Sequence, residues 1–254
     1  MEVHAHTHTA RKKWTHYFWE FLMLFLAVFC GFLAEYQLEH KIEKQRAKEF
    51  AFSLYRDITA DTLAFNRNIN NLNICVTKID SLIELLGNKD EIVKNTALIH
   101  RLSIYAFIFP QNKPNESTIQ QLLNSGSLRY FRSSRLVDSV KDYNSEIQLY
   151  KEFREDIGAF NIESRKVQAS VLDMNPIIVA ISNGGFLAQE KTGLDPVIFA
   201  DTQPMTTDPL LVKEYANWCA LKKFYISRTA VQFHTLNRRA GGVLQILKDE
   251  YHFK

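Results

Sequence analysis

The sequence predicts an all-α protein, in which an N-terminal transmembrane helix is followed by an antiparallel bundle of about four main helices. Three observations carry this prediction. An uncharged apolar run extends from Phe21 to Ala34. After it, apolar residues recur at spacings of three and four over long segments, as on one face of a helix. Most Gly and Pro residues fall in breaks between these segments, and those breaks that are short favour antiparallel neighbours.

The apolar run has the length and flanks of a membrane span. From Tyr17 to Ala34 only Glu20 is ionised, and the segment from Tyr17 to Tyr36 approaches the roughly 20 residues that a helix needs to cross a bilayer. A buried core helix and a cleaved signal peptide are the alternatives. Cleavage after Ala34 is disfavoured because bulky Phe32 lies where a small residue is needed. Aromatic residues suited to the two interfaces flank the run: Trp14, Tyr17, Trp19 and Tyr36.

Charge predicts the orientation of the span. The short tail, residues 1–16, carries three clustered basic residues, Arg11 to Lys13, and one acid, Glu2. Lys and Arg are nearly balanced across the two flanks, and a long C-terminal domain can cross regardless of its charge. We therefore expect residues 1–16 to form a cytoplasmic tail, residues 17–36 to span the membrane, and residues 37–254 to form a helical-bundle soluble domain on the far side.

One face of the predicted span carries small residues. Glu20, Ala27, Gly31 and Ala34 share this face by their spacing. Ala27 and Gly31 form a small-xxx-small pair, which allows two helices to approach closely, so this face is a candidate for self-association. The alternative is that small residues merely occur in the span, with Glu20 at headgroup level or beside His16 one turn away.

The first bundle helix is predicted from an unbroken 4-3 apolar stripe that Gly87-Asn88 ends. The span is expected to run straight into this helix, because neither Gly nor Pro occurs from 37 to 56. The stripe comprises Ile58, Thr62, Phe65, Ile69, Leu72, Val76, Ile79, Ile83 and Leu86.

Shorter elements are expected next. A second helix over residues 90–109 should stop at Pro110, because proline lacks the amide that a helix interior requires. Residues 110–116 are predicted to be a loop. Ser117 is expected to cap a short helix that Gly126 closes.

Two long helices complete the predicted bundle. A third helix should begin at Ser134 and end at Asn175-Pro176. The last should begin at Asp208-Pro209, an N-cap followed by proline in the first turn. Gly241-Gly242 is expected to bend or fray that helix. Between them, residues 175–207 are predicted to be an irregular insertion that serves as a contact surface or as a cap over the bundle end. Asn183-Gly184 could mark a small hairpin there, and short helical turns are equally compatible.

Motifs of catalysis are missing from the sequence. It contains no phosphate-binding loop, dinucleotide turn, nucleophile elbow or H-E-x-x-H pair, and no His has Glu three residues before it. We therefore predict no catalytic, cofactor-binding or metal site. The net charge of +3 comes from interspersed acids and bases, so no nucleic-acid partner is expected. His4, His6 and His8 are interpreted as solvated tail residues, and whether Cys75 pairs with Cys219 stays open.

Two stretches resemble an uncharacterised family of single-span, membrane-anchored helical proteins seen mainly in Bacteroidetes. They are WTHYFWEFLMLFLAVFCGFLAE at 14–35 and STIQQLLNSGSLRYFRSSRLVDSVKDY at 117–143, where a similar Leu-x-x-Ser-Gly-x-Leu turn joins a short helix to a long one. The resemblance implies a bacterial inner-membrane protein with a periplasmic helical domain. It implies no activity.

The predicted role follows from seams that bury apolar residues instead of lining a polar cleft. We expect a membrane-anchored extracytoplasmic interaction or scaffold module that binds another envelope protein or forms a homo-oligomer. A ligand-binding sensor domain that works with a separate signalling partner is the alternative, because helical bundles can hold small molecules between helices. An enzyme without a recognisable motif ranks third.

Overall fold

The computed structural model describes residues 14–109, 112–182, 196–200, 202 and 205–253. Every regular element among these residues is helical, which confirms the predicted all-α class. The elements are α1 (Trp14–Leu86), α2 (Lys89–Lys94), α3 (Thr96–Phe107), α4 (Ser117–Asn124), η1 (Ser127–Tyr130), α5 (Ser134–Val171), α6 (Met174–Ser182), η3 (Pro196–Phe199) and α7 (Pro209–Tyr251).

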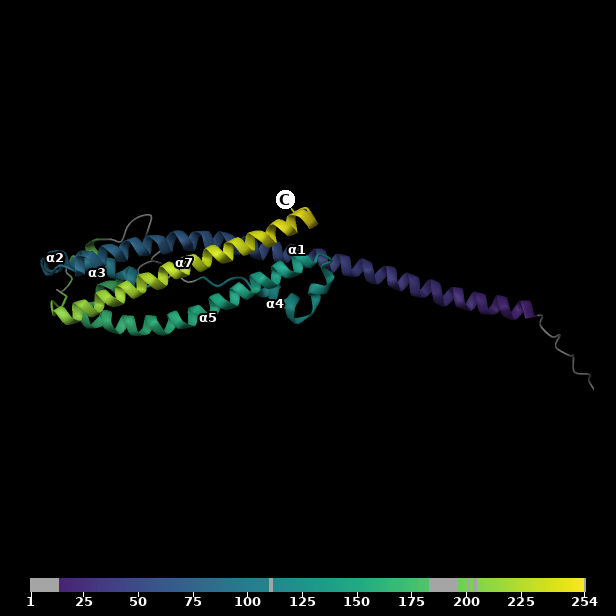
Figure 1. Ribbon diagram of the computed structural model, residues 1–254, viewed down its shortest axis with the longest axis horizontal. Coiled ribbons are helices and arrows are strands. Elements are labelled where there is room, and N and C mark those ends of the chain that lie inside the picture. The colour runs from purple at the N-terminus through teal and green to yellow at the C-terminus, as the bar shows by residue number, and fades with distance from the viewer. Residues whose placement is uncertain (1–13, 110–111, 183–195, 201, 203–204, 254) are drawn as a thin grey trace, which may run out of the picture. The chain divides into compact units, whose positions relative to one another are not determined.

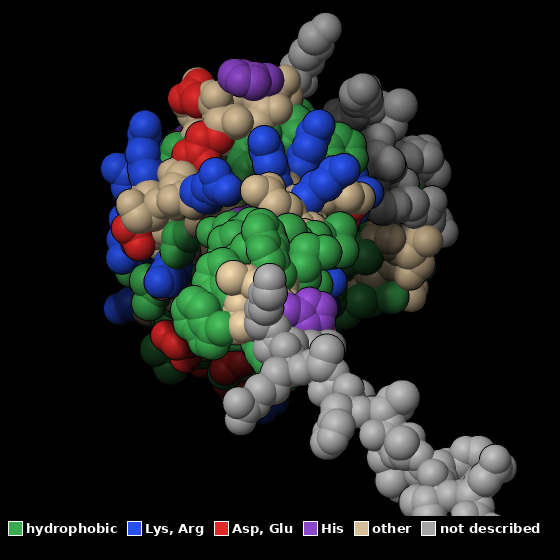
Figure 2. Space-filling model, turned by 90° about the vertical axis from the view of Figure 1, so that its right-hand side faces the viewer, with side chains coloured by type: hydrophobic (Ala, Val, Ile, Leu, Met, Phe, Trp, Pro, Cys, Tyr) green, Lys and Arg blue, Asp and Glu red, His purple; other side chains and the backbone are tan. Residues whose placement is uncertain are grey.

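The chain divides into two compact units, residues 1–50 and 51–254, and α1 contributes to both. In the first unit, hydrophobic side chains are exposed all around the helix, and none of its most apolar 18-residue window is buried (Figure 2). Among the described residues, α1 is the one helix long and apolar enough to cross a membrane. A helix that is apolar on every side needs an apolar environment from outside the chain.

Three long helices form the second unit: α1 from Ala51 onwards, α5 and α7 (Figure 1). α7 runs antiparallel to α1, because residues later in α7 contact residues earlier in α1. The Lys223 ammonium lies 2.5 Å from the Asp80 carboxylate, and the Asn237 amide donates to Asn66 over 2.7 Å. The same reversal relates α7 to α5 through the pairs Lys222–Asn161 and Arg239–Asp142.

The predicted stripe of α1 consists of two sets of residues, each spaced by seven, and the structure buries every member of the first set. Ile58, Phe65, Leu72, Ile79 and Leu86 are buried, as predicted. In the second set the structure buries residues one position earlier than predicted, except at Ile69. Asp61, Cys75 and Leu82 lie in the core, whereas Thr62, Val76 and Ile83 are half-buried. A search for apolar residues passes over the buried carboxylate of Asp61, and it does not distinguish the buried member of an apolar pair such as Cys75-Val76 or Leu82-Ile83.

The second predicted helix is shorter than expected and is interrupted. It forms α2 and α3, which meet at Asn95, and α3 ends where Ile108 adopts an extended backbone. We call residues 108–116 the strap; its described residues are 108–109 and 112–116. They carry no helical assignment. α3 and the strap together run antiparallel to α5, because Ser103 contacts Gln168 and Asn112 contacts Tyr150. The described residues of the strap thus continue α3 along α5 without forming a helix.

The turn after α4 is only partly as predicted. Gly126 has φ +68°, a left-handed conformation that suits glycine, and it ends the short helix as expected. The predicted cap at Ser117 is wrong. Glu116 precedes the first turn, and the Ser117 hydroxyl donates to Asp57 of α1 instead. Helix α5 begins at Ser134, as predicted, and the side chain of its N-cap residue Ser133 accepts from the Leu136 amide.

The predicted break at Asn175-Pro176 is also misplaced. Helix α5 ends at Val171, and these two residues belong to the first turn of α6, where the missing proline amide costs no hydrogen bond. The predicted irregular insertion at 175–207 therefore begins as a helix and contains η3. The possible hairpin at Asn183-Gly184 lies outside the described residues.

Helix α7 begins as the sequence predicts. The Asp208 side chain accepts from the amides of Leu210 and Leu211, with Pro209 in the first turn. The predicted fraying at Gly241-Gly242 is wrong, because α7 continues unbroken to Tyr251. Buried Ala240 and Val243 on either side anchor this part of α7 in the core.

Candidate functional site

The four residues predicted for self-association lie in the exposed part of α1. Ala27, Gly31 and Ala34 are all uncovered, and a Cβ added at Gly31 would meet no atom within 4 Å. Glu20 lies 3.1 Å from the His16 ring, which confirms the local pair expected one turn apart. No other described part of the chain covers this face of small residues.

Two buried carboxylates of α1, Asp57 and Asp61, hold the strap. Both side chains are 4% exposed. The Asn115 backbone amide donates to Asp61 over 2.9 Å, and the Tyr143 hydroxyl donates to the same carboxylate over 2.8 Å. Asp57 accepts from the hydroxyl of Thr118 at the start of α4 over 2.5 Å. These contacts join α1, the strap, α4 and α5.

The described residues of the strap have no helical assignment, and this explains these polar contacts. A helix satisfies its own amides and carbonyls, but chain without regular structure inside a bundle needs other partners for them. Side chains supply the partners instead. Besides Asp61, the Tyr150 hydroxyl donates to the Asn112 carbonyl over 3.0 Å. Glu116 at the end of the strap accepts from Lys151 over 3.1 Å and from Gln148 over 3.2 Å.

Burial governs the electrostatics of this cluster. Desolvation raises the pKa of Asp61, the two donated hydrogen bonds oppose the rise, and repulsion from Asp57 and Glu116 adds to it. Burial likewise raises the pKa of the Tyr143 hydroxyl, which Asp61 reinforces. Nowhere in the described part of the chain do three His, Cys, Asp or Glu side chains group as metal ligands would. The carboxylates therefore act as hydrogen-bond acceptors that organise the strap.

A second polar cluster surrounds Lys222 of α7, which is 1% exposed. Its ammonium donates to the Asn161 side chain over 2.5 Å and lies 5.0 Å from the centre of the Phe109 ring. Burial lowers the pKa of Lys222 to about 7, and the nearby Arg165 contributes in the same direction. The Arg165 guanidinium in turn lies 4.5 Å from the centre of the Phe107 ring. Phe107 at the end of α3 and Phe109 in the strap thus bind two cations.

Two cysteines and one histidine are further buried polar residues of the core. Cys75 and Cys219 are free, buried thiols. Burial raises the pKa of Cys219 to about 12, so its reactive thiolate is scarce at neutral pH. Burial also lowers the pKa of His100, whose ring accepts from the Asp173 amide over 3.2 Å. Burial therefore favours the neutral forms of Cys219 and His100.

The outer side of α5 and α7 carries an aromatic surface, which we define as Phe153, Phe160, Trp218, Phe224 and Tyr225. Phe160 contacts Trp218 and Tyr225 with ring centres 5.1 and 4.6 Å apart, and Tyr225 also contacts Phe153 and Phe224. Four of the five rings are half-buried, and Phe224 is 60% exposed. Leu221 and Val231, about half exposed, lie on the same outer side of α7 by their spacing from Phe224.

The polar clusters left signals in the sequence that an apolar search misses. Asp57 and Asp61 are one turn apart, and Asp61 continues the spacing of the buried residues Leu54 and Ile58. Lys222 likewise stands at core spacing between Cys219 and Ile226. A charged residue at a seam position of a long helix was therefore the available clue to a buried polar partner.

Comparison of the chain with protein-family models, with curated proteins and with solved structures finds no match.

Proposed function

We propose that this chain is a single-pass protein of the bacterial inner membrane, with a cytoplasmic N-terminus and a periplasmic bundle that serves as an interaction or scaffold module. The exposed apolar part of α1 is the observation that carries the proposal. Its window has a mean hydropathy of 2.0 and no buried residue. In water such a surface would drive aggregation, whereas in a bilayer it is the stable arrangement.

The aromatic surface supports the interaction role of the bundle. Aromatic side chains are enriched at the centres of protein interfaces, because they bury a large area at a low cost in side-chain entropy. Interior polar groups offer less for a chemical role, since Asp57, Asp61 and Lys222 are already bonded within the chain. We therefore assign binding to the surface of α5 and α7, and stability to the buried clusters.

Site-specific photocrosslinking in growing cells tests this role. A photoreactive phenylalanine analogue replaces Phe224 on the aromatic surface or Asn70 on α1, a matched exposed control. The proposal predicts a discrete crosslinked product from position 224 and none from position 70. No product at position 224, or equal products at both positions, would contradict the assignment.

The size of the product distinguishes the two kinds of partner. A product of twice the chain mass indicates self-association, and any other discrete mass indicates an envelope protein. If the small-residue face of the span drives self-association, the double variant Ala27→Leu and Gly31→Leu will abolish the dimeric product, since bulky side chains keep the two helices apart. A dimer that survives the double variant assigns self-association to the bundle alone.

A further inference from the structure

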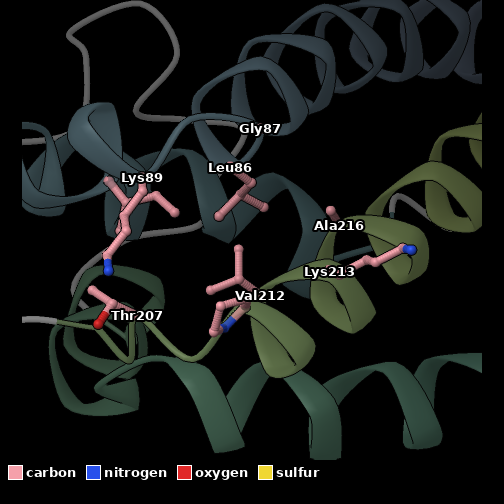
Figure 3. Close-up of a pocket in the computed structure, with 9 residues that line it drawn as sticks. Leu86, Gly87, Lys89, Thr207, Val212, Lys213 and Ala216 are labelled. Carbon is pink, nitrogen blue, oxygen red and sulfur yellow. The ribbon is translucent and has the colours of Figure 1, made fainter.

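An apolar cavity lies at the end of the bundle where α1 finishes and α7 begins (Figure 3). Its volume is about 340 Å³, at the lower end of the range for small-molecule sites. Leu86 of α1, Ile92 of α2, and Val212 and Ala216 of α7 supply its apolar wall. Leu86, Ile92 and Val212 are each at most 6% exposed, so this wall belongs to the packed core.

One side of the cavity is polar. The Lys89 side chain extends along it with its amine directed towards Thr207, whereas the amine of Lys213 points away (Figure 3). Neither lysine forms an ion pair with any residue in the described ranges. The Lys89 ammonium and the Thr207 hydroxyl therefore border an apolar wall, and this combination suits a ligand with one anionic end and one apolar end.

We propose that this cavity binds a free medium-chain monocarboxylate, with the alkyl chain against Leu86, Ile92 and Val212 and the carboxylate at Lys89 and Thr207. A wholly apolar ligand would leave Lys89 unused, and a phosphate would find a single ammonium with no arginine fork. The limited volume favours one short chain over a diacyl lipid. This binding is independent of the proposed scaffold role and uses a different part of the bundle.

Calorimetric titration of decanoate into the full chain in lipid nanodiscs at about pH 8 tests the proposal, with empty nanodiscs as the blank. We expect saturable binding of one decanoate per chain. Lys89→Met, which keeps the apolar stem, should weaken binding about tenfold, because a charge-assisted contact is lost. Ala216→Leu should also weaken it, by filling the cavity. Lys94→Met, an exposed lysine of the same short helix, is the matched control and should bind like the wild type.

Decanol separates the roles of the two ends of the ligand. It should bind more weakly than decanoate to the wild type and equally weakly to Lys89→Met. The proposal is overturned if decanoate binding does not exceed that of empty nanodiscs. It is equally overturned if Lys89→Met and Ala216→Leu both bind like the wild type. Normal helicity of each variant, measured by circular dichroism, confirms that any loss is a loss of the site.

Discussion

Asp61 is the residue on which the strap depends most. Its carboxylate accepts the Asn115 amide and the Tyr143 hydroxyl inside the bundle. Asp61→Ala would leave both donors without a partner, so we expect the free energy of unfolding to fall by about 2–3 kcal/mol. Thermal unfolding of the full chain in mild detergent, followed by circular dichroism, measures the change.

Asp80→Ala provides the matched control for this prediction. Asp80 lies on the same helix and pairs with Lys223, but both side chains are partly exposed. Solvent screens such a pair, and its loss should cost at most about 1 kcal/mol. Equal losses in the two variants would show that the strap does not need the buried carboxylate.

Lys222 gives the bundle a predicted pH dependence. Its pKa falls from 10.5 to about 7 on folding, so the unfolded chain binds more protons between these values. The contribution of this group to stability therefore rises with pH from about 7 towards 10.5, with a slope of at most ~1.4 kcal/mol per pH unit. Lys222→Met removes the contribution. The melting temperatures of both proteins at about pH 7 and pH 9 measure it.

The variant should also be at least as stable as the wild type at neutral pH, because the cost of burying the amine exceeds the value of the hydrogen bond to Asn161 that methionine cannot make. A rise in melting temperature with pH that is the same in both proteins would assign the effect to other groups. A wild-type melting temperature that does not rise between about pH 7 and pH 9 would also contradict the prediction.

Residue identities in the core were the least predictable feature of this chain. The seam of α1 was predicted from Ile58, Phe65 and Leu72, because buried apolar residues recur at helical spacing. Seam spacing was the one clue to the burial of Asp61 and Lys222, and it does not identify their partners, although a charged side chain is buried only where specific partners exist. Those partners, Asn115 and Asn161, are 54 and 61 residues away in the sequence.

At the scale of elements, the two glycines of α7 are replaceable. Gly241 and Gly242 are exposed within a continuous helix, and a Cβ at either would meet no atom within 4 Å. Changing either to Ala should stabilise the protein by roughly 0.5–1 kcal/mol, because alanine loses less backbone entropy on folding. Gly126→Ala should destabilise it by a similar amount, since its φ is +68°.

Thermal unfolding of the three variants under one set of conditions checks this ordering. Stabilisation by Gly126→Ala would contradict the left-handed turn after α4. Loss of stability at position 241 or 242 would show that the helix needs glycine there, as the predicted bend would have required.

Local signals predicted the helices and the loop before α4, but not the contacts that hold the strap. Asp208-Pro209 fixed the start of α7, and Gly87-Asn88 fixed the end of α1, because caps and turns depend on neighbouring residues. Pro176 misled, since proline either ends a helix or lies in its first turn, and spacing alone does not distinguish the two. The strap takes its conformation from Asp61, Tyr150 and Glu116, which are brought together only by the complete bundle.

At the scale of the molecule, α1 connects two physically different environments. Its first part presents apolar side chains on every side, whereas from Ala51 onwards it packs into a core with its own polar network. The span face, the aromatic surface and the apolar cavity are three separate features. Sequence predicted the first from Ala27 and Gly31. The other two depend on how α1, α5 and α7 pack, and no local sequence pattern predicts them.

The central claim is that α1 anchors the bundle on the outer side of the inner membrane. The most direct test labels single cysteines with a membrane-impermeant maleimide in spheroplasts, in a chain whose own three cysteines are replaced by serine or alanine. One cysteine replaces Ser134, an exposed residue of the bundle, and the other replaces Thr7 in the tail. We predict labelling at position 134 without lysis, labelling at position 7 only after lysis, and retention of the chain in membranes after alkaline extraction. Labelling at position 7 in intact spheroplasts, protection of position 134, or release of the chain by alkali would contradict the claim.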